Sequence, residues 1–419
     1  MLASNQLHAN QSRCMTFPPD FAPLRGIRIV ELCTNIAGPF GAMILAQLGA
    51  DVIKIESPTG DDSRHYASPL NDVSVVHRYV NAGKRSLVLD LKSQKGQEAA
   101  LRLIGTANVL LQSMRPGTLE RLGLGKEATR EINPSLLYYD VNGFGAGAVG
   151  ATLPGYDPLV QAFTGIMEMT GHDGSPPTRC APSVIDLGTG QWIALGVVAA
   201  LMARHAGQPV EEIETALVDT GFNLAAYQAT SAYVTGVRPP RAGSGNPIAA
   251  PYECYETQDG YLLIAAANQR LWLGVTRALD APELADDPRF LSVAERSGNR
   301  QELAHELSDR LRTRPTEDWL PVFARERVPV GRVLGLEQAI KTNVAGERRT
   351  MLDSDGVPLV RLPWLIDDRE IPWQRPAPDL GAHTEAVLRD LGYDGQELAE
   401  LSGAVTCASL SSSSTSRAT

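Results

Sequence analysis

One carboxylate, Asp186, lies between an apolar run and a turn that contains Gly188 and Gly190. The run, the turn and the following apolar stretch 192–202 predict strand, tight turn and helix, which puts Asp186 at or near a helix N-terminus. An aspartate there can cap the helix by accepting backbone N–H bonds. It can also act as a nucleophile, because a carboxylate is ionised at neutral pH and needs no general base. Local context alone favours the cap.

Basic side chains flank two other strand-like runs. Lys84 and Arg85 come just before the run 86–89, and Arg115 comes just after the run 108–112. Ligands of open α/β sheets collect outside the carboxyl ends of the strands, so Arg115 is well placed for an anionic group such as a phosphate. Solvated surface charges are an equal alternative for each of these residues.

The elements that must position these side chains alternate between strand and helix. A strand at 26–32, a helix opened by Gly38 and Pro39, and a strand at 51–56 form a βαβ unit. Further strand-like runs, at 86–89, 108–112 and 136–141, alternate with helical stretches at 94–104 and 126–132. This alternation predicts an α/β protein with a Rossmann-like parallel sheet.

A dinucleotide-binding fingerprint is missing from the first turn. Glu56 ends the second strand, where such folds keep an acidic residue, but the turn 33–41 lacks the Gly-x-Gly-x-x-Gly pattern. We therefore expect neither nicotinamide nor flavin.

Composition bounds the class of protein. The chain has 419 residues, 43% of them hydrophobic, and a formal net charge of −10, which opposes binding to nucleic acid or an anionic membrane surface. Its five cysteines are scattered, with none in a Cys-x-x-Cys pair, so no disulfide framework or metal site is expected. The apolar stretch 192–202 is about half the length that crosses a bilayer. We expect a cytoplasmic protein.

Composition along the chain predicts its domains. They are a disordered leader (1–22), the first part of a large Rossmann-like domain (23–225), a linker with a glycine loop (226–247), a small α/β domain (248–330), a return segment that completes the large domain (331–402) and a disordered Ser-rich tail (403–419).

A series of motifs in chain order resembles the class III coenzyme A transferase family, which includes formyl-CoA:oxalate and carnitine CoA-transferases and the 2-methylacyl-CoA racemases. The motifs are the Ala37-Gly38-Pro39 turn, the strand 48–56, Gly60-Asp61 with Arg64, the segment 81–86, Arg115-Pro116-Gly117, Gly155-Tyr156-Asp157, Thr170-Gly171, the Asp186 segment, and Pro251-Tyr252 with Asp259-Gly260. Each motif is weak alone, but together they cover about 23–401.

The resemblance implies a mechanism for Asp186. In such transferases the matching aspartate attacks the acyl-CoA thioester to give a mixed anhydride, and the CoA thiolate then forms an aspartyl thioester that the acceptor acid attacks. Coenzyme A is thus a substrate, small carboxylic acids are the partners, and no metal or redox cofactor is needed. The family fold also implies an interlocked homodimer.

Tyr156 separates the branches of the family. The racemases resemble this chain but carry a histidine at this position, which exchanges an α-proton together with the later aspartate. Tyrosine is a poor proton shuttle at neutral pH, so the sequence favours CoA transfer between carboxylic acids. A racemase or epimerase and a noncatalytic CoA-binding paralogue remain the alternatives.

The resemblance also suggests binding residues. Arg115 and Arg121 match a segment that contacts CoA, whereas Asn142 and Ser57 stand where relatives often have a basic residue. The candidates for CoA binding are Lys84, Arg85, Arg115, Arg121 and Asn142. The candidates for the substrate pocket are Tyr156, Gln161 and the loop Gly243, Ser244 and Gly245, which resembles a shortened glycine-rich lid and could equally be a plain connector. Arg179, Arg241 and Gln161 could hold a distal carboxylate or be structural.

Overall fold

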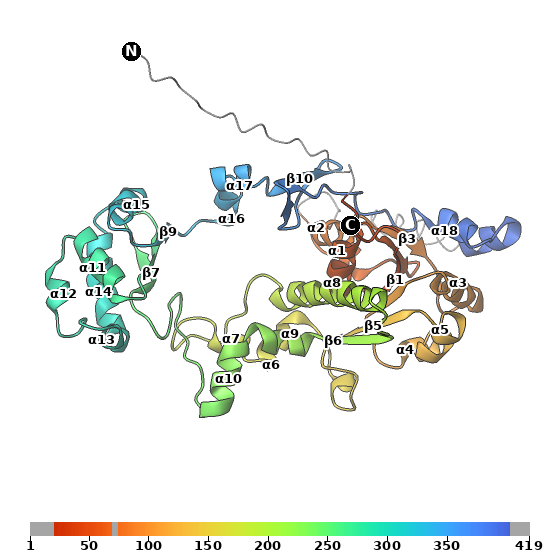
Figure 1. Cartoon of the computed structure of the whole chain (residues 1–419), viewed down its shortest axis with the longest axis horizontal. Helices are drawn as coiled ribbons and strands as arrows, with labels where there is room; N and C mark the ends of the chain where they lie inside the picture. The colour runs from red at the N-terminus through yellow and green to blue at the C-terminus, as the bar shows by residue number, and fades with distance from the viewer. Residues whose placement is uncertain (1–20, 69–73, 403–419) are drawn as a thin grey trace, which may run out of the picture. The chain divides into compact units, whose positions relative to one another are not determined.

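The computed structural model describes residues 21–68 and 74–402 (Figure 1). The tail predicted at 403–419, and the leader predicted at 1–22 apart from its last two residues, lie outside the described residues. The chain divides into two compact units: the first comprises the described residues up to Val141, Gly190–Glu214 and the chain from Leu352, and the second comprises Asn142–Thr189 and Thr215–Met351.

The first unit is built on a six-stranded sheet in the order β3-β2-β1-β4-β5-β6. Its strands are β1 (Arg28–Leu32), β2 (Asp51–Glu56), β3 (Arg85–Val88), β4 (Val109–Gln112), β5 (Leu137–Asn142) and β6 (Glu212–Ala216). The pairs from β3 through β5 are all parallel. Strands buried on both faces require the nearly continuous apolar runs that the sequence has here.

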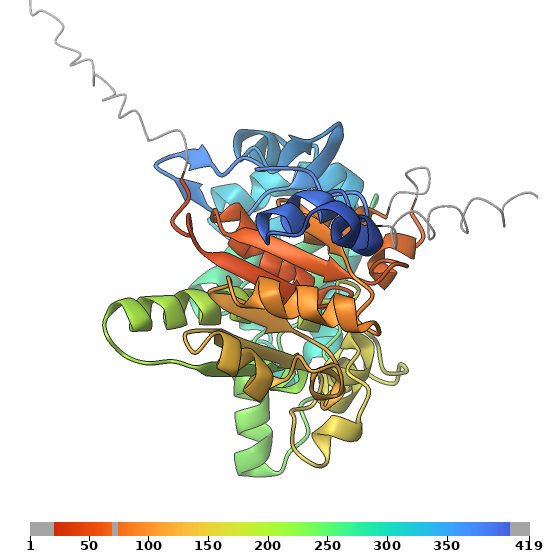
Figure 2. The ribbon, with the colours of Figure 1, turned by 90° about the vertical axis from the view of Figure 1, so that its right-hand side faces the viewer.

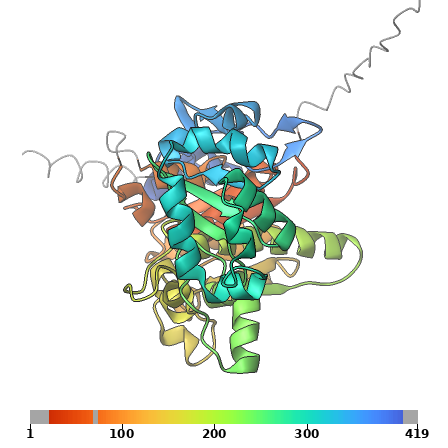
Figure 3. The ribbon, with the colours of Figure 1, turned by 90° about the vertical axis from the view of Figure 1, so that its left-hand side faces the viewer.

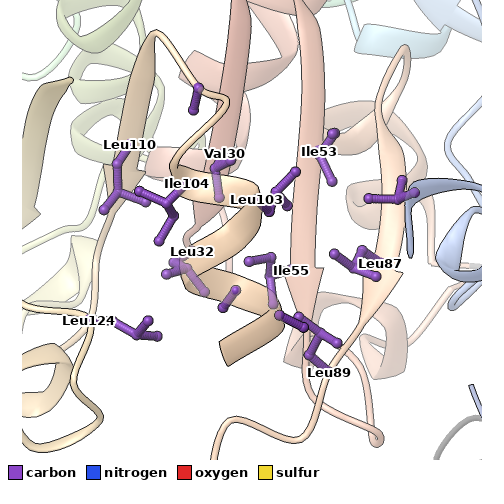
Figure 4. Packing of buried hydrophobic residues seen from close by; sticks show 14 of the residues in the cluster. Val30, Leu32, Ile53, Ile55, Leu87, Leu89, Leu103, Ile104, Leu110 and Leu124 are labelled. Atoms are coloured by element: carbon purple, nitrogen blue, oxygen red, sulfur yellow. The ribbon is translucent and has the colours of Figure 1, made fainter. Parts of the chain in front are cut away.

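Helices cover both faces of this sheet. On one face, α3 (Gln94–Ile104) and α18 (Thr384–Asp390) pack on apolar side chains of β1 to β4 (Figures 2 and 4). The other helices of the first unit are α1 (Ala37–Gln47), α2 (Val75–Asn81), α4 (Thr118–Arg121) and α5 (Lys126–Ile132), with the 3₁₀ helix η1 (Asp62–His65).

The helix α8 (Val184–His205) differs from the prediction. The residues expected to form a strand and a glycine turn belong to its first two turns. Gly190 faces α1, because a Cβ on Gly190 would lie 2.7 Å from Phe40 Cδ1. The glycines therefore permit close helix packing, whereas the sequence pattern suggested a turn.

This helix is also longer than the apolar stretch 192–202. Its 22 residues are long and apolar enough to cross a bilayer, so the expectation that this segment is too short was wrong. Core helices of water-soluble proteins reach the same length and composition, so α8 by itself is weak evidence for a membrane span.

The second unit contains a three-stranded antiparallel sheet of β7 (Tyr252–Glu256), β8 (Tyr261–Ala265) and β9 (Val330–Arg332). Figure 3 shows the helices α11 (Gln269–Ala278), α14 (Arg300–Leu311) and α15 (Thr316–Arg325) beside this sheet. Their apolar side chains form a core with Trp272. The remaining helices of this unit are η2 (Gly150–Thr152), α6 (Asp157–Phe163), α7 (Ile166–Met169), α9 (Leu217–Leu224), α10 (Ala226–Thr235), α12 (Glu283–Asp286), α13 (Val293–Gly298), α16 (Leu336–Ala339) and α17 (Asn343–Glu347).

The unit boundaries differ from the predicted domains. The prediction joined all of 23–225 to the sheet, whereas 142–189 and the chain from Thr215 belong to the second unit. The reason is local: after β5 the chain packs against α9, where Val218 donates its N–H to the Gly143 carbonyl at 3.0 Å.

Two short hairpins come after the second unit's last helix in the chain. They are β10 (Met351–Ser354) with β11 (Val357–Val360), and β12 (Leu365–Ile366) with β13 (Arg369–Glu370).

A buried ion-pair network joins β1, β2 and the segment before β3. Lys54 Nζ lies 3.2 Å from Glu31 Oε1 and 2.8 Å from Asp61 Oδ2. Lys84 Nζ lies 2.7 Å from the second Glu31 oxygen and 2.9 Å from Asn81 Oδ1. Each carboxylate thus compensates a buried cation, which would otherwise be very costly.

A third carboxylate, Glu56, is held by Arg64. The guanidinium donates two hydrogen bonds to Glu56, at 2.8 and 2.7 Å, and the Ser86 hydroxyl donates a third at 2.6 Å. Burial opposes the charge on Glu56, yet Arg64 prevails and lowers the Glu56 pKa from 4.5 to about 2. Burial also opposes the charge on Asp61, and Lys54 lowers the Asp61 pKa from 3.8 to about 2.

These two carboxylates predict acid sensitivity. Both pKa values are lower in the folded than in the unfolded chain, so their contribution is fully present above about pH 4.5 and is lost as the pH falls to about 2. We expect each to remove about 2–3 kcal/mol from the free energy of unfolding across that window. Urea unfolding at pH 6, 4.5, 3.5 and 2.5 follows this loss, and Glu56→Gln should flatten the dependence.

Candidate active site

Asp186 lies in the first turn of α8, and the carboxylate that caps this helix is that of Asp157. Asp157 Oδ2 accepts the N–H of Ile185 at 2.9 Å and that of Asp186 at 3.3 Å. The cap that local context predicted for Asp186 is therefore supplied from α6. Among the residues that the structure describes, the Asp186 carboxylate itself has no hydrogen-bond partner, which leaves it available for chemistry.

Two effects change the acidity of Asp186. Burial comes first and the nearby charge of Asp157 second, and together they raise the Asp186 pKa from 3.8 to about 7. The sequence predicted a carboxylate that is fully ionised at neutral pH, and the structure instead has one that is partly protonated there. A more basic carboxylate is a better nucleophile once it is ionised.

Gln161 holds Asp157 in place. Its Nε2 donates to Asp157 Oδ1 at 2.7 Å, and its Oε1 accepts the N–H of Cys180 at 2.9 Å. The side chain is fully buried. In this structure both ends of the amide are engaged within the protein, so a direct hold on a substrate carboxylate, as the sequence suggested, does not fit its position.

The other predicted pocket residues of this unit differ in exposure. Tyr156 precedes α6 and is 59% exposed. Arg241 is engaged by Glu168, at 2.7 Å to Oε2 and 2.6 Å to the backbone oxygen. Arg179 donates to the carbonyls of Cys180 and Ala181. Tyr156 thus remains open to a ligand, whereas both arginines have partners in the protein.

The glycine loop is tied down at several points. The Gly243 N–H donates to the Gly171 carbonyl at 2.9 Å, and Ser244 Oγ accepts the N–H of Cys254 at 2.9 Å. Gly243 has φ +60°, and a Cβ there would lie 2.5 Å from His172 Nδ1. A Cβ on Gly245 would collide with Arg300 Nη2. The positive φ of Gly243 therefore favours glycine, and a side chain at position 245 would displace the Arg300 guanidinium.

A cavity of about 320 Å³ lies in the first unit at the carboxyl ends of β1, β2 and β3. Its exposed surface is mostly apolar, with Ile55, Leu89 and Met114. The lining also includes the cation Lys92 and the carboxylates Glu56, Asp61 and Asp90. Since β1 pairs with β2 on one side and β4 on the other, the cavity lies at the topological switch point where open α/β sheets bind ligands.

The predicted CoA-binding arginines separate into two groups. Arg115 and Arg121 are exposed and follow β4, next to cavity residues Met114 and Leu122. Arg85 instead begins β3, so it lies at the amino ends of the strands, where it pairs with Asp51 at 2.8 Å. Arg85 is therefore badly placed for a ligand at the carboxyl edge.

Two further candidates have structural contacts. Lys84 is fully buried and its ammonium is held by Glu31, so the predicted contact with a CoA phosphate does not fit its position. Asn142 ends β5, and its Oδ1 accepts the N–H of Gly145 at 2.5 Å. Lys92, a cation after β3, was not predicted from the sequence, because only the position of the strand end places it at the cavity.

The role of Asp157 was also missed. The pair Asp157-Pro158 at the start of α6 is a recognisable helix-start signal. That Asp157 caps a second helix, 28 residues further along the chain, is a tertiary contact with no local signal.

Comparison with known proteins decides the family. Residues 24–384 match the sequence model of CoA-transferase family III. The chain belongs to this family. It is 35% identical over 371 residues to acetyl-CoA:oxalate CoA-transferase of Acetobacter aceti, covering 88% of this chain and 95% of the relative. It is 32% identical to succinate–glutarate CoA-transferase of Agrobacterium fabrum, covering 88% and 96%.

Solved structures agree with the fold. A CAIB/BAIF family protein from Brucella suis has a TM-score of 0.81 at 32% identity, covering 89% of this chain and all of that one. The protein is thus a class III CoA-transferase enzyme, and its substrates are CoA thioesters. In the part of the chain that the structure describes, no cluster of His, Cys, Asp or Glu could hold a metal ion.

Proposed function

We propose that this CoA-transferase moves CoA between small carboxylic acids by covalent catalysis at Asp186. The observation that carries the proposal is a half-buried carboxylate without a hydrogen-bond partner among the described residues, in the first turn of a helix whose N–H groups are capped by Asp157. Relatives named for oxalate, succinate and glutarate support small acids, including dicarboxylic acids, as the substrate class.

The reaction needs no external reagent. The Asp186 carboxylate attacks the thioester carbonyl, the C–S bond breaks, and the thiolate of CoA leaves behind a mixed anhydride. The thiolate then attacks the aspartyl carbonyl, which releases the donor acid and forms an aspartyl thioester. The acceptor carboxylate reverses both steps and restores Asp186. Holding the reactants together can supply several kcal/mol of the barrier.

The nucleotide end of CoA is assigned to the cavity of the first unit. Its apolar lining suits an adenine ring, while Lys92, Arg115 and Arg121 provide positive charge near its rim for phosphates. The pocket for the acids is assigned to Tyr156 and the loop 243–245, which would exclude water from the anhydride.

The functional test is a screen of acyl-CoA donors against carboxylate acceptors. We expect exchange of CoA and, after trapping with hydroxylamine or borohydride, a mass change on the peptide that contains Asp186. An adduct on another residue would contradict the mechanism. Uptake of deuterium at the α-carbon without an acceptor acid would instead identify a racemase.

The raised pKa of Asp186 predicts the pH dependence of the first step. Because the ionised form attacks, kcat/KM for acyl-CoA should rise about tenfold per unit below pH 7 and level off above it. Initial rates between pH 5.5 and 8.5 measure the midpoint. A flat profile over this range would show that the pKa of Asp186 is not raised in the working enzyme.

We further propose a cytoplasmic homodimer with interlocked chains, and an exposed apolar helix face supports the dimer. Helix α10 has no buried residue, and Tyr227 and Tyr233 on it are 77% and 93% exposed. An isolated helix of 10 residues is marginal in water, so a partner surface must stabilise it. We expect sedimentation to give twice the 45.0 kDa mass of the chain at every protein concentration tested. A monomer would contradict this.

A further inference from the structure

We propose that Asp157 is the positioning residue that keeps Asp186 reactive, by capping α8 with a carboxylate near the nucleophile. This inference rests on the proposed role of Asp186 in acyl transfer. It assigns a function to a residue that would otherwise be only the start of a helix.

The hydrogen bonds fix the ionisation state of Asp157. Its Oδ2 accepts two backbone N–H groups, those of Ile185 and Asp186, so this oxygen carries no proton. Its Oδ1 accepts Gln161 Nε2. The orientation of that amide is set independently, because Gln161 Oε1 must face the N–H of Cys180. Both carboxylate oxygens of Asp157 thus accept hydrogen bonds, and neither faces a group to which a protonated oxygen could donate. This is the pattern of an ionised carboxylate.

The same contacts determine what Asp186 experiences. The first N–H groups of a helix normally stabilise a nearby anion. At α8 Asp157 occupies two of them, so they are not available to the Asp186 carboxylate. Asp186 is therefore denied the stabilisation that would make it a weak base and a poor nucleophile.

Two other described elements, α1 and α9, pack on the first two turns of α8 and bring uncharged groups to it. From α1, Phe40 faces Gly190. From α9, Thr220 Oγ1 accepts from Thr189 at 2.9 Å, and a Cβ on Gly188 would lie 3.0 Å from Thr220 Cγ2. Asp219 on α9 is exposed. Besides burial, Asp157 is the group that raises the Asp186 pKa.

The arrangement favours the covalent intermediates. When Asp186 is acylated, its negative charge leaves on the thiolate of CoA, and the repulsion with Asp157 ends. In the free enzyme the charges of Asp157 and Asp186 repel each other. In the acylated enzyme Asp157 faces a neutral anhydride. Asp157 raises the energy of the free enzyme relative to the acylated one without contacting the substrate.

The chain offers a matched pair of variants. Asp157→Asn removes the charge, but its Nδ2 then faces Gln161 Nε2, donor to donor, so the variant also loses a hydrogen bond. The double variant Asp157→Asn with Gln161→Glu restores every bond. In it the asparagine oxygen accepts from α8, the asparagine amide donates to the introduced carboxylate, and that carboxylate accepts from Cys180. The negative charge has only moved one side chain away from Asp186.

Two readouts test the proposal. The first is the pH midpoint of kcat/KM for acyl-CoA, and the second is the infrared band of the protonated Asp186 carboxyl, identified as the band that Asp186→Asn removes. We expect both midpoints to fall by about one pH unit or more in the double variant, while its thermal stability matches the wild type. The fraction of trapped covalent adduct should fall by about tenfold.

The outcomes separate the two proposals. A double variant with normal stability and an unchanged infrared midpoint would overturn the role of Asp157. A shifted infrared midpoint in a protein that transfers no CoA would retain the charge coupling and reject the proposed function. Asp219→Asn, which removes an exposed charge from α9, should change neither midpoint.

Discussion

Replacing Asp186 by asparagine is expected to lower the turnover of CoA transfer by about four orders of magnitude or more. The amide has nearly the shape of the carboxylate but cannot form an anhydride with the acyl group. The fold should survive, because the Asp186 side chain has no hydrogen-bond partner among the described residues and its backbone N–H still donates to Asp157. Initial rates of CoA exchange and circular dichroism of the same preparation measure both expectations.

The control for this experiment is Asp219→Asn, which removes an exposed aspartate of α9 and should leave turnover unchanged. Deamidation can regenerate an aspartate at position 186, so the residual rate should be compared with the fraction of reverted peptide seen by mass spectrometry. Turnover within tenfold of the wild type, in a preparation without reversion, would exclude Asp186 as the nucleophile.

Much of the sheet could be predicted because each of its elements has a local signal. The strand predicted at 51–56 is β2, and the helices predicted at 94–104 and 126–132 are α3 and α5 with the same bounds. Buried parallel strands require apolar runs, and Ser93 caps α3 by accepting the N–H of Gly96, as a helix start requires. Such features depend on residues close together in the chain.

The segment around Asp186 was misjudged for a different reason. Glycine is typical of turns, but in α8 Gly190 serves a contact with α1 that only the folded chain contains. The same limit applies to charges. Exposed Arg115 and buried Lys84 look alike in the sequence, and the partner of Lys84 is Glu31, far away along the chain. Asp186 could be found because the order of motifs along the whole chain, rather than its neighbours, identified it.

The buried ion pair of Lys84 and Glu31 predicts a large effect on the free energy of unfolding. Lys84 and Glu31 are both fully buried, with 2.7 Å between Nζ and Oε2. Burial lowers the pKa of Lys84 and Glu31 opposes this shift, which leaves the pKa at about 8. Glu31→Gln removes the compensating charge and leaves an uncompensated ammonium next to Asn81. We expect a loss of about 3–5 kcal/mol in the free energy of unfolding.

Variants of Lys84 then separate a structural role from CoA binding. In the wild-type background Lys84→Met should be destabilising, because Glu31 then keeps only Lys54 as a partner. In the Glu31→Gln background the same substitution should be less destabilising, because it no longer removes the partner of a buried carboxylate. Urea unfolding of the two single variants and the double variant gives the coupling. The KM for acyl-CoA should stay within about twofold of the wild type, whereas Arg121→Met should raise it. Loss of a buried ion pair lowers stability, whereas loss of a phosphate contact weakens substrate binding. A stable Lys84→Met variant with a strongly raised KM would therefore show that Lys84 binds CoA.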